Sequence, residues 1–460
     1  MKYFKFSEHN AKIFSACVFF YIALLFFFAY ISRSHDHDLI LIIGSFGFIF
    51  FCYVFRTLTL TGSLSFADLS LVFISINFIY IIYPLLSFCL SGFIWTDISD
   101  ARLRAYDLTS QELADFSLFH LCYFSGLVIY SLFIMNRLSL SIKPTRSKSV
   151  DLLVLTLIFL ISQFISFLRI FPALESVYFY KQLNNAFSMI GYLSSLGIII
   201  FCTIRWKLIF WRFLIYLFIF YHFTLVLLGL SGRTYFYMIL LGFLIIYNRN
   251  IKIFPISQVL LLVFILFTLL LILGYVRTNQ LSYFGEYNFF SGSNEFTTIL
   301  GTAYDLYHRL YIEGDLIDIP IYVRYNDFFL LIPSQFLDSY KWSTSDWYLE
   351  IIGLTGTGVG MMFGIIAQGI IGHGYIELLI LGLLVGVLIT SLAYFFNKHN
   401  EKLVMSIGFV FIATKSYYIY RAGFGYIIYF LIYNFVPFLL LFQTLKYIID
   451  NRLKIVLPEI

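Results

Sequence analysis

The sequence predicts an all-α polytopic membrane protein, and three observations carry this prediction. The chain has 460 residues, of which 61% are hydrophobic and only 12% are charged, whereas a soluble domain carries roughly a quarter charged residues. Apolar runs of about 18 residues or more recur along the chain, and each is long enough to cross the bilayer core as a helix. Lys and Arg gather in alternate loops between these runs, as they do on the cytoplasmic side of membrane proteins.

The apolar runs predict about 12 transmembrane helices in a single transmembrane domain that spans 1–460. The first run lacks a small-residue cleavage signal, which favours a retained helix over a signal peptide. The predicted spans cover 13–32, 39–55, 68–90, 115–135, 152–171, 186–204, 208–230, 234–248, 256–276, 375–396, 403–420 and 424–445.

The distribution of positive charge predicts that both termini are cytoplasmic. With this orientation, 18 of the 30 Lys and Arg residues lie in short cytoplasmic segments. These are Lys2, Lys5, Lys12, Arg56, Arg137, Lys143, Arg146, Lys148, Arg205, Lys207, Arg212, Arg249, Lys252, Lys398, Lys402, Lys446, Arg452 and Lys454. The opposite side carries fewer basic residues over more chain, with acids interleaved.

The outer side is predicted to carry one large periplasmic loop, 278–357, within the transmembrane domain. The glycine-rich segment 358–374 follows it. A further crossing at 358–374 would place the basic C-terminus outside, so we interpret this segment as re-entrant or interfacial. Gly382 and Gly386 are four residues apart in the next span, a spacing that lets two helices approach closely.

Several residue types give little indication of chemistry. All 5 cysteines lie inside apolar segments, which favours packing over disulfides or zinc sites. His120 and His222 lie within spans, and we interpret both as packing residues. No nucleotide-binding pattern occurs, and the net charge of +5 reflects the loops between spans and does not indicate a nucleic-acid partner.

Five cations gather at the predicted outer ends of spans: Arg169, Arg233, Arg277, Lys415 and Arg421. Positive charge is depleted on this side of most membrane proteins, and cations near hydrocarbon are costly unless they are paired or face water. Arginine matches phosphate oxygens with two parallel hydrogen bonds and keeps its charge. The cluster therefore indicates a phosphate-binding site. The alternative is that these side chains anchor helix ends by reaching toward the interface, which we favour for Arg169.

The large loop adds further candidates. Arg309, Arg324 and Tyr325 are predicted to contact substrate, because cations hold phosphate and aromatic rings stack on sugars. Glu295 and Asp327 are candidates for positioning an acceptor or removing its proton. The alternative is an interfacial aromatic belt, since aromatic residues make up 21% of the whole chain.

The order of short motifs from about 225 to 430 resembles the O-antigen (Wzy-type) polymerases, a family that includes the enterobacterial common antigen polymerase. The matching pieces are "GLSGRT", "LGYVRT", "NEF", "RYNDFFLLIPSQFL", "GTGVGMMFGIIAQGIIGHG" and "RAGFG". The N-terminal half matches only as a hydrophobic pattern. In the glycine run, this chain has Gln368 where the family often has a glutamate, so Gln368 cannot act as a base.

The resemblance implies an architecture like that of GT-C glycosyltransferases and a role in lipopolysaccharide biosynthesis. It implies a multi-pass protein of the bacterial inner membrane that transfers a growing glycan from one undecaprenyl pyrophosphate carrier to the non-reducing end of a lipid-linked repeat unit. Arg233, Arg277 and Arg421 would act on the pyrophosphate. No cofactor or metal is expected, and a chain-length regulator is the expected protein partner.

Two other functions are alternatives to the polymerase. An O-antigen ligase uses a similar lipid-linked donor, and His308–Arg309 resembles the histidine and arginine of its large loop. A flippase for the lipid-linked repeat unit would belong to a different class. It would be expected to have short loops and charges at mid-membrane, whereas this chain has a large loop and nearly uncharged span centres.

Overall fold

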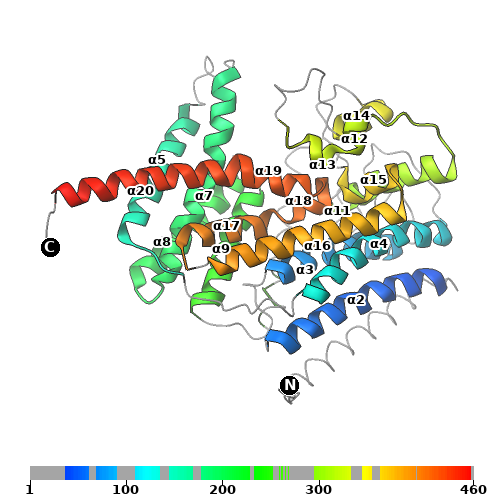
Figure 1. The fold of residues 1–460 in the computed structure, drawn as a ribbon, viewed down its shortest axis with the longest axis horizontal. Helices are drawn as coiled ribbons and strands as arrows, with labels where there is room; N and C mark the ends of the chain where they lie inside the picture. The colour runs from blue at the N-terminus through cyan, green and yellow to red at the C-terminus, as the bar shows by residue number, and fades with distance from the viewer. Residues whose placement is uncertain are drawn as a thin grey trace.

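The chain folds into a bundle of helices in the computed structural model (Figure 1). The structure describes residues 37–61, 69–90, 109–134, 145–168, 178–227, 233–251, 295–332, 344–354, 363–399 and 401–456, with a few single positions between 258 and 268. Every named element in these ranges is a helix. The first group comprises α2 (His37–Thr61), α3 (Leu69–Leu90), α4 (Ser110–Ile134), α5 (Ser149–Phe167), α7 (Tyr178–Ile204), α8 (Ile209–Leu227) and α9 (Arg233–Asn250).

The second group includes the short helices of the large loop and the last long helices. It comprises α11 (Glu295–Tyr307), η4 (His308–Ile312), α12 (Ile321–Arg324), α13 (Asn326–Phe329), α14 (Thr344–Ile351), α15 (Gly364–Ile371), α16 (Tyr375–Lys398), α17 (Leu403–Lys415), α18 (Tyr417–Ala422), α19 (Gly425–Phe430), η6 (Leu431–Phe435) and α20 (Val436–Val456). The label η marks a π-helical turn.

Six helical segments of the described residues are long and apolar enough to cross a membrane. They are Gln111–Ile129, Ser149–Phe167, Phe187–Ile204, Ile209–Leu227, Tyr375–Phe396 and Gly425–Asn451. This confirms the predicted class, a helical membrane protein with several spans. The predicted total of about 12 spans stays a prediction, because 13–32 and most of 256–276 lie outside the described residues.

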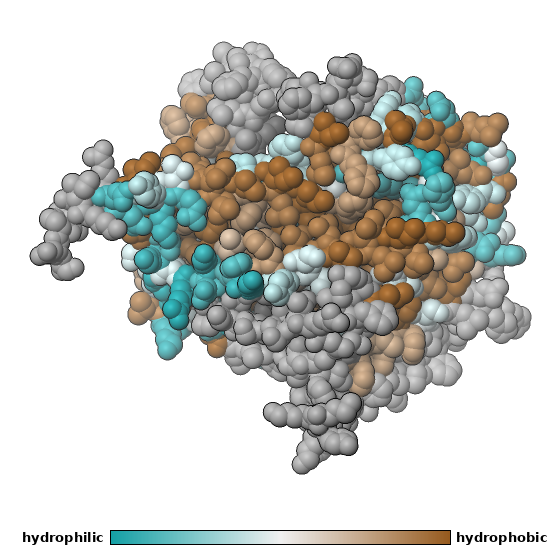
Figure 2. Space-filling view, in the orientation of Figure 1, coloured by the Kyte–Doolittle hydropathy of each residue, from teal (hydrophilic) through white to brown (hydrophobic). Residues whose placement is uncertain are grey.

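The outer helices of the bundle expose apolar side chains. In α8 only 11% of the apolar segment is buried, compared with 78% of the segment in α7. Phe213 and Phe220 of α8 and Phe164 of α5 are among the exposed side chains. Hydrophobic residues cover the middle of the face in Figure 2, and hydrophilic residues gather toward its two ends. An apolar surface of this extent is stable against lipid rather than water.

The predicted spans overlap the described helices, although α4 begins at Ser110 rather than 115 and α7 at Tyr178 rather than 186. A further difference lies near the C-terminus. The expected single helix 403–420 is two helices, because α17 ends at Lys415 and α18 begins at Tyr417. The expected span 424–445 is one continuous helical segment that extends to Val456 and contains the π-helical turn η6 between α19 and α20. The average hydropathy of a span reveals neither a break nor a π-helical turn within it.

Glycine allows α4 and α16 to pack with their backbones nearly in contact. A Cβ atom at Gly382 would lie 2.1 Å from the carbonyl oxygen of Tyr123, and one at Gly126 would lie 2.2 Å from that of Leu379. Real Cβ atoms do not approach backbone this closely. The close packing predicted at Gly382 is therefore confirmed, and its partner is α4.

The glycine-rich segment 358–374 is described from Phe363 onward. It contains α15, a helix of 8 residues that are all buried, followed by a turn before α16. A helix of this length spans about 12 Å, which is far short of the bilayer core. The interpretation of 358–374 as re-entrant fits this geometry and stays a prediction.

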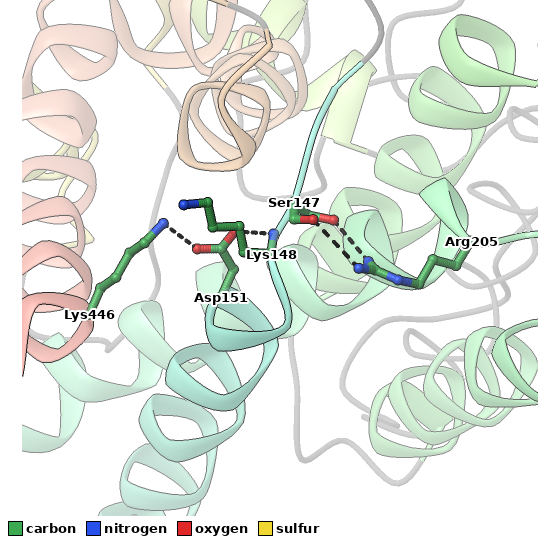
Figure 3. A network of polar contacts seen from close by, with 5 residues as sticks. All are labelled: Ser147, Lys148, Asp151, Arg205 and Lys446. Atoms are coloured by element: carbon green, nitrogen blue, oxygen red, sulfur yellow. Dashed lines mark hydrogen bonds and ion pairs between the residues drawn. The ribbon is translucent and has the colours of Figure 1, made fainter. Parts of the chain in front are cut away.

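A polar junction gathers at the start of α5 (Figure 3). The Asp151 carboxylate accepts a hydrogen bond from the backbone N–H of Lys148 at 2.7 Å and forms an ion pair with the Lys446 ammonium of α20. The Arg205 guanidinium, just after α7, donates to the Ser147 hydroxyl at 2.9 Å. The junction thus ties the start of α5 to the end of α7 and to α20.

The same junction reaches two further helices. The backbone N–H of Arg146 donates to the carbonyl of Glu401 at 2.8 Å, and the Thr145 and Ser406 hydroxyls share a hydrogen bond of 2.8 Å. The backbone N–H of Thr145 donates to the Asn250 side chain at 3.4 Å. Loops that the charge pattern predicts on one side of the membrane therefore contact one another.

Two helices connect this junction with the region of the predicted outer cations. α9 runs for 18 residues from Arg233 to Asn250, where it reaches the junction, and a helix of this length is about 27 Å long. α17 leaves the junction at Leu403 and ends after 13 residues at Lys415. The junction thus lies at the opposite ends of α9 and α17 from Arg233 and Lys415, while Arg169 and Arg277 lie outside the described residues.

Candidate functional site

Lys415 is a buried cation among aromatic rings. Its side chain is 2% exposed, and its ammonium lies 5.0 Å from the ring centre of Tyr235, 5.1 Å from Tyr418 and 5.0 Å from Phe430. Cations bind the faces of aromatic rings at such distances. Among the described residues no carboxylate pairs with this ammonium, although a buried charge normally has such a partner.

Arg421 lies beside Lys415. Its guanidinium carbon is 5.3 Å from the ring centre of Tyr418, the same ring that Lys415 contacts. Tyr418 is three residues after Lys415 and three before Arg421, a helical spacing that places side chains on one face. Two positive charges therefore share one aromatic ring at the junction of α17 and α18.

The start of α9 lies beside the same pair. Tyr235, which contacts Lys415, stacks on Tyr192 of α7 with ring centres 3.6 Å apart. Arg233 is the first residue of α9, two positions before Tyr235, so its backbone is close to the Lys415 site. The side chain of Arg233 and the whole of Arg277 lie outside the described residues.

The turn after Arg421 is wrapped around Asp327 of the large loop. Gly423 has φ +103°, a conformation that favours glycine, and a Cβ atom there would lie 2.2 Å from Asp327 Oδ1. The backbone N–H of Gly425 donates to the same oxygen at 2.9 Å. Asp327 is therefore a central contact between the large loop and the segment that carries Arg421.

Asp327 is fully buried, at 0% exposure. Its Oδ2 has no well-aligned hydrogen-bond partner among the described residues. Burial raises the pKa of the carboxyl to about 7, although hydrogen bonds from the Gly425 and Phe424 backbone and the nearby Gln368 side chain act in the opposite direction. The group is thus partly protonated near neutral pH. Gln368, the departure from the family pattern, lies next to this carboxyl.

Arg324 forms a second cationic position. Its guanidinium lies 2.8 Å from Nε2 of His373, in the turn before α16, while Glu377 accepts the backbone N–H of His373 at 2.7 Å. Nε of Arg324 is buried without a partner among the described residues. The guanidinium also lies 5.8 Å from the ring centre of Tyr325, whose side chain is 42% exposed.

The other loop candidates lie apart from Lys415. Arg309 pairs with Asp305 of its own helical run at 3.0 Å, and the hydroxyl of Tyr348 donates to the same carboxylate at 2.7 Å. The hydrogen bond from Tyr348 ties α14 to α11. Glu295 begins α11, and its side chain is outside the described residues.

The histidines predicted as packing residues are buried. His120 is 0% exposed, and its Nδ1–H donates a hydrogen bond of 3.2 Å to the Phe116 carbonyl, which confirms the prediction of a hydrogen-bonded packing histidine. His222 is 1% exposed, which confirms its burial, but neither of its ring nitrogens has a hydrogen-bond partner among the described residues. Sequence reasoning did not single out Tyr235, Tyr418 or Phe430 as the surroundings of Lys415. Only Tyr418 carries a local signal for this role, the spacing of three residues to each cation.

The arrangement as a whole is suited to binding an anion. Lys415 and Arg421 provide two neighbouring positive charges, and the aromatic rings exclude water from Lys415, which strengthens its attraction for an anion. Comparisons of the chain with protein-family models, with curated proteins and with solved structures find no match. A function for this chain therefore rests on the chemistry of its own residues.

Proposed function

We propose that this protein is an O-antigen polymerase, a glycosyltransferase of the bacterial inner membrane. It would transfer a growing glycan from one undecaprenyl pyrophosphate carrier to the non-reducing end of a repeat unit on another, at the periplasmic face. The observation that carries the proposal is the cation pair of Arg421 and Lys415. Arg421 is partly exposed, and Lys415 is buried beside it and pairs with no carboxylate of the described residues. Such a cation pair fits a pyrophosphate, and the surrounding apolar bundle fits a polyprenyl carrier.

In the proposed reaction, the acceptor hydroxyl oxygen forms a bond to the anomeric carbon of the donor glycan. The bond from that carbon to the pyrophosphate oxygen breaks, and undecaprenyl pyrophosphate leaves with the electron pair. Preorganised positive charges stabilise the negative charge that grows on this oxygen. The acceptor proton passes to a base, and holding both substrates on one protein supplies proximity.

Arg421 and Lys415 are the described residues with the strongest support for the pyrophosphate side. Arg233 joins them in the proposal through the position of its backbone at the start of α9, and Arg277 through the motif resemblance. Arg324 and Tyr325 are proposed to contact the glycan or the second carrier. Arg309 remains a weaker candidate, because its side chain pairs with Asp305.

Glu295 is the proposed carboxylate of the acceptor side, and Asp327, the other acid considered for that role, is buried. Glu295 rests on the motif "NEF" alone. Asp327 has a described environment, which determines the role argued for it in the next subsection. A chain-length regulator is the protein partner that the proposal implies.

The deciding experiment compares surface polysaccharide from a deletion strain complemented with Arg421→Ala, Lys415→Ala or the unchanged chain. Each variant should lower the amount of polymer longer than one repeat unit by at least about tenfold, because it removes charge stabilisation from the leaving group. Single capped repeat units should remain on the gel. Lys398→Ala provides a matched control, since Lys398 is an exposed cation at the far end of α16.

The same gel separates the alternative functions. Loss of a ligase leaves bare lipopolysaccharide core while unligated polymer accumulates on the carrier, and loss of a flippase leaves repeat units on the cytoplasmic face. A full ladder from a well-expressed Arg421→Ala variant would contradict the proposed site. Purified protein given only lipid-linked repeat units should build longer glycans without a nucleotide sugar, which no flippase or ligase does.

A further inference from the structure

The short helices α12 and α13 of the large loop dock on the turn that follows Arg421. Three contacts hold them there. The Gly425 N–H donates to Asp327 Oδ1 at 2.9 Å, the rings of Phe328 and Phe424 meet edge to face with centres 5.7 Å apart, and the Tyr433 hydroxyl donates to the Leu331 carbonyl at 3.1 Å. Only the first of these contacts is made by a fully buried side chain.

The fit around Asp327 leaves no room for a side chain on the turn. A Cβ atom at Gly423 would lie 2.2 Å from Asp327 Oδ1, and one at Gly425 would lie 2.3 Å from its backbone oxygen. On the other side, a Cβ atom at Gly364 of α15 would lie 3.3 Å from the Tyr420 carbonyl. The backbone of Arg421 is therefore held between α15 and the Asp327 contact.

The same fit prevents Asp327 from meeting a substrate directly. The residue is 0% exposed, and one carboxyl oxygen already accepts a backbone N–H. A base must come within about 3 Å of the hydroxyl whose proton it removes. Removal of the carboxyl would leave the Gly425 N–H without its partner, and a buried donor without a partner destabilises the turn.

We infer that Asp327 is a positioning residue. By accepting the Gly425 N–H, it fixes the large loop to the Gly423–Gly425 turn and so holds Arg421 in the position proposed for pyrophosphate binding. The expected change in polymer length depends on the proposed function above. The contact between Asp327 and the turn does not depend on that function, since it concerns only the position of the turn.

An amide distinguishes a positioning carboxyl from a base. In Asp327→Asn the side-chain oxygen still accepts the Gly425 N–H, but the group cannot take a proton. Asp327→Ala lacks the acceptor altogether. If Asp327 positions Arg421, Asp327→Asn should polymerise within about threefold of the unchanged chain, whereas Asp327→Ala should lose at least about tenfold, as expected for a misplaced charge.

Gly425→Ala tests the same contact from its other side. The added methyl group would meet the Asp327 backbone and push the turn away while the carboxyl remains in place. It should lose polymer as Asp327→Ala does. Asp315→Ala, in an exposed part of the same loop, is the matched control and should not change the ladder. Membrane abundance of each variant is measured alongside, and either Asp327→Ala or Gly425→Ala suffices if the other does not accumulate.

A second measurement is independent of any activity. The 5 native cysteines are replaced, Ala422→Cys is introduced into the turn, and the rate of its reaction with a polar maleimide is measured. The rate should rise severalfold in Asp327→Ala and stay near the starting value in Asp327→Asn. An unchanged rate in Asp327→Ala overturns the inference, whatever the polysaccharide gel shows.

The gel gives the remaining outcomes. Equal losses in Asp327→Asn and Asp327→Ala would show that the charge or proton of Asp327 is needed, which overturns the positioning role. A full ladder from Asp327→Ala would also overturn it. A deletion strain that keeps its normal ladder contradicts the proposed polymerase, and the maleimide rates then decide the contact alone.

Discussion

At the scale of single residues, Lys415 shows how function and stability oppose each other. Taking an ammonium out of water costs several kcal/mol, and three rings near 5 Å return part of this at about 0.5–2 kcal/mol each. A methionine of similar length would keep the packing and make favourable contacts with the same rings. The proposed anion-binding role would account for a charged residue at this position.

The first prediction concerns this charge. Lys415→Met should unfold at a temperature no lower than the unchanged protein, measured in detergent, because the desolvation cost is removed. It should nevertheless lose polymer as severely as Lys415→Ala. A clear drop in unfolding temperature with normal polymer would mean that the lysine serves the fold instead.

The second prediction concerns Asp327 and pH. Its pKa is about 7 in the folded chain against the ordinary 3.8, so between these values the folded state binds more protons than the unfolded state. The free energy of unfolding should then fall as pH rises, by up to about 1.4 kcal/mol per pH unit. Tyr123 and Tyr426 are the titratable groups that interact with this carboxyl, and phenols ordinarily titrate near pH 10.

Asp327→Asn isolates this effect, because the amide stays neutral throughout. Its unfolding temperature should exceed that of the unchanged chain by an amount that grows from about pH 4 to about pH 7 and then stays constant. A difference that does not change with pH would contradict the raised pKa. The other carboxyls of the chain titrate in the same way in both proteins, so their contributions cancel in the difference between the two unfolding temperatures.

The identities of these residues were predictable, but their surroundings were not. Lys415 and Arg421 stand out in the sequence because charge is rare near apolar spans, whereas Asp327 is one of two candidate acids in the large loop. The contact of Lys415 with Tyr235 joins positions far apart in the chain, and no local spacing encodes it. Likewise, the sequence alone gives Asp327 the pattern of a solvated loop residue, and only the structure shows Gly423 and Gly425 packed around it.

At the scale of helices, hydropathy located the long elements well and their interruptions poorly. α16 (Tyr375–Lys398) and α9 (Arg233–Asn250) match the predicted spans 375–396 and 234–248 closely. Hydropathy averaged over the span 403–420 did not reveal the break at Ser416, although Thr414, Lys415 and Ser416 form a short polar run there. This break matters, since it separates the helix that carries Lys415 from the one that carries Arg421.

The third prediction concerns the backbone contact between α4 and α16. Gly382→Ala and Gly126→Ala should each destabilise the protein by about 1–3 kcal/mol, because the helices must separate to admit a methyl group. The double variant should cost less than the sum, since the first substitution already moves the helices apart. Leu384→Ala, on the exposed side of α16, is the control. Additive losses would mean that the two glycines do not share one contact.

At the scale of the whole molecule, two polar regions lie at opposite ends of α9 and α17. One is the junction of Asp151, Lys446, Arg205 and Ser147, and the other contains Lys415 and Arg421. Most of the residues in the junction come from loops that the positive-inside rule assigns to the cytoplasm. In the proposed topology, the apolar surface between the two regions would face the membrane, and the cation pair would lie at its periplasmic boundary.

The final prediction tests this orientation directly. In a chain without its native cysteines, Leu316→Cys lies in a fully exposed part of the large loop, and Lys148→Cys lies in the exposed part of the junction. A membrane-impermeant maleimide added to intact spheroplasts should label Leu316→Cys and not Lys148→Cys, because only the former faces the periplasm. Lysis should expose both thiols to the reagent. Labelling of Lys148→Cys in intact spheroplasts would invert the topology, place Lys415 and Arg421 on the cytoplasmic side, and remove the proposed polymerase from the compartment where its substrates meet.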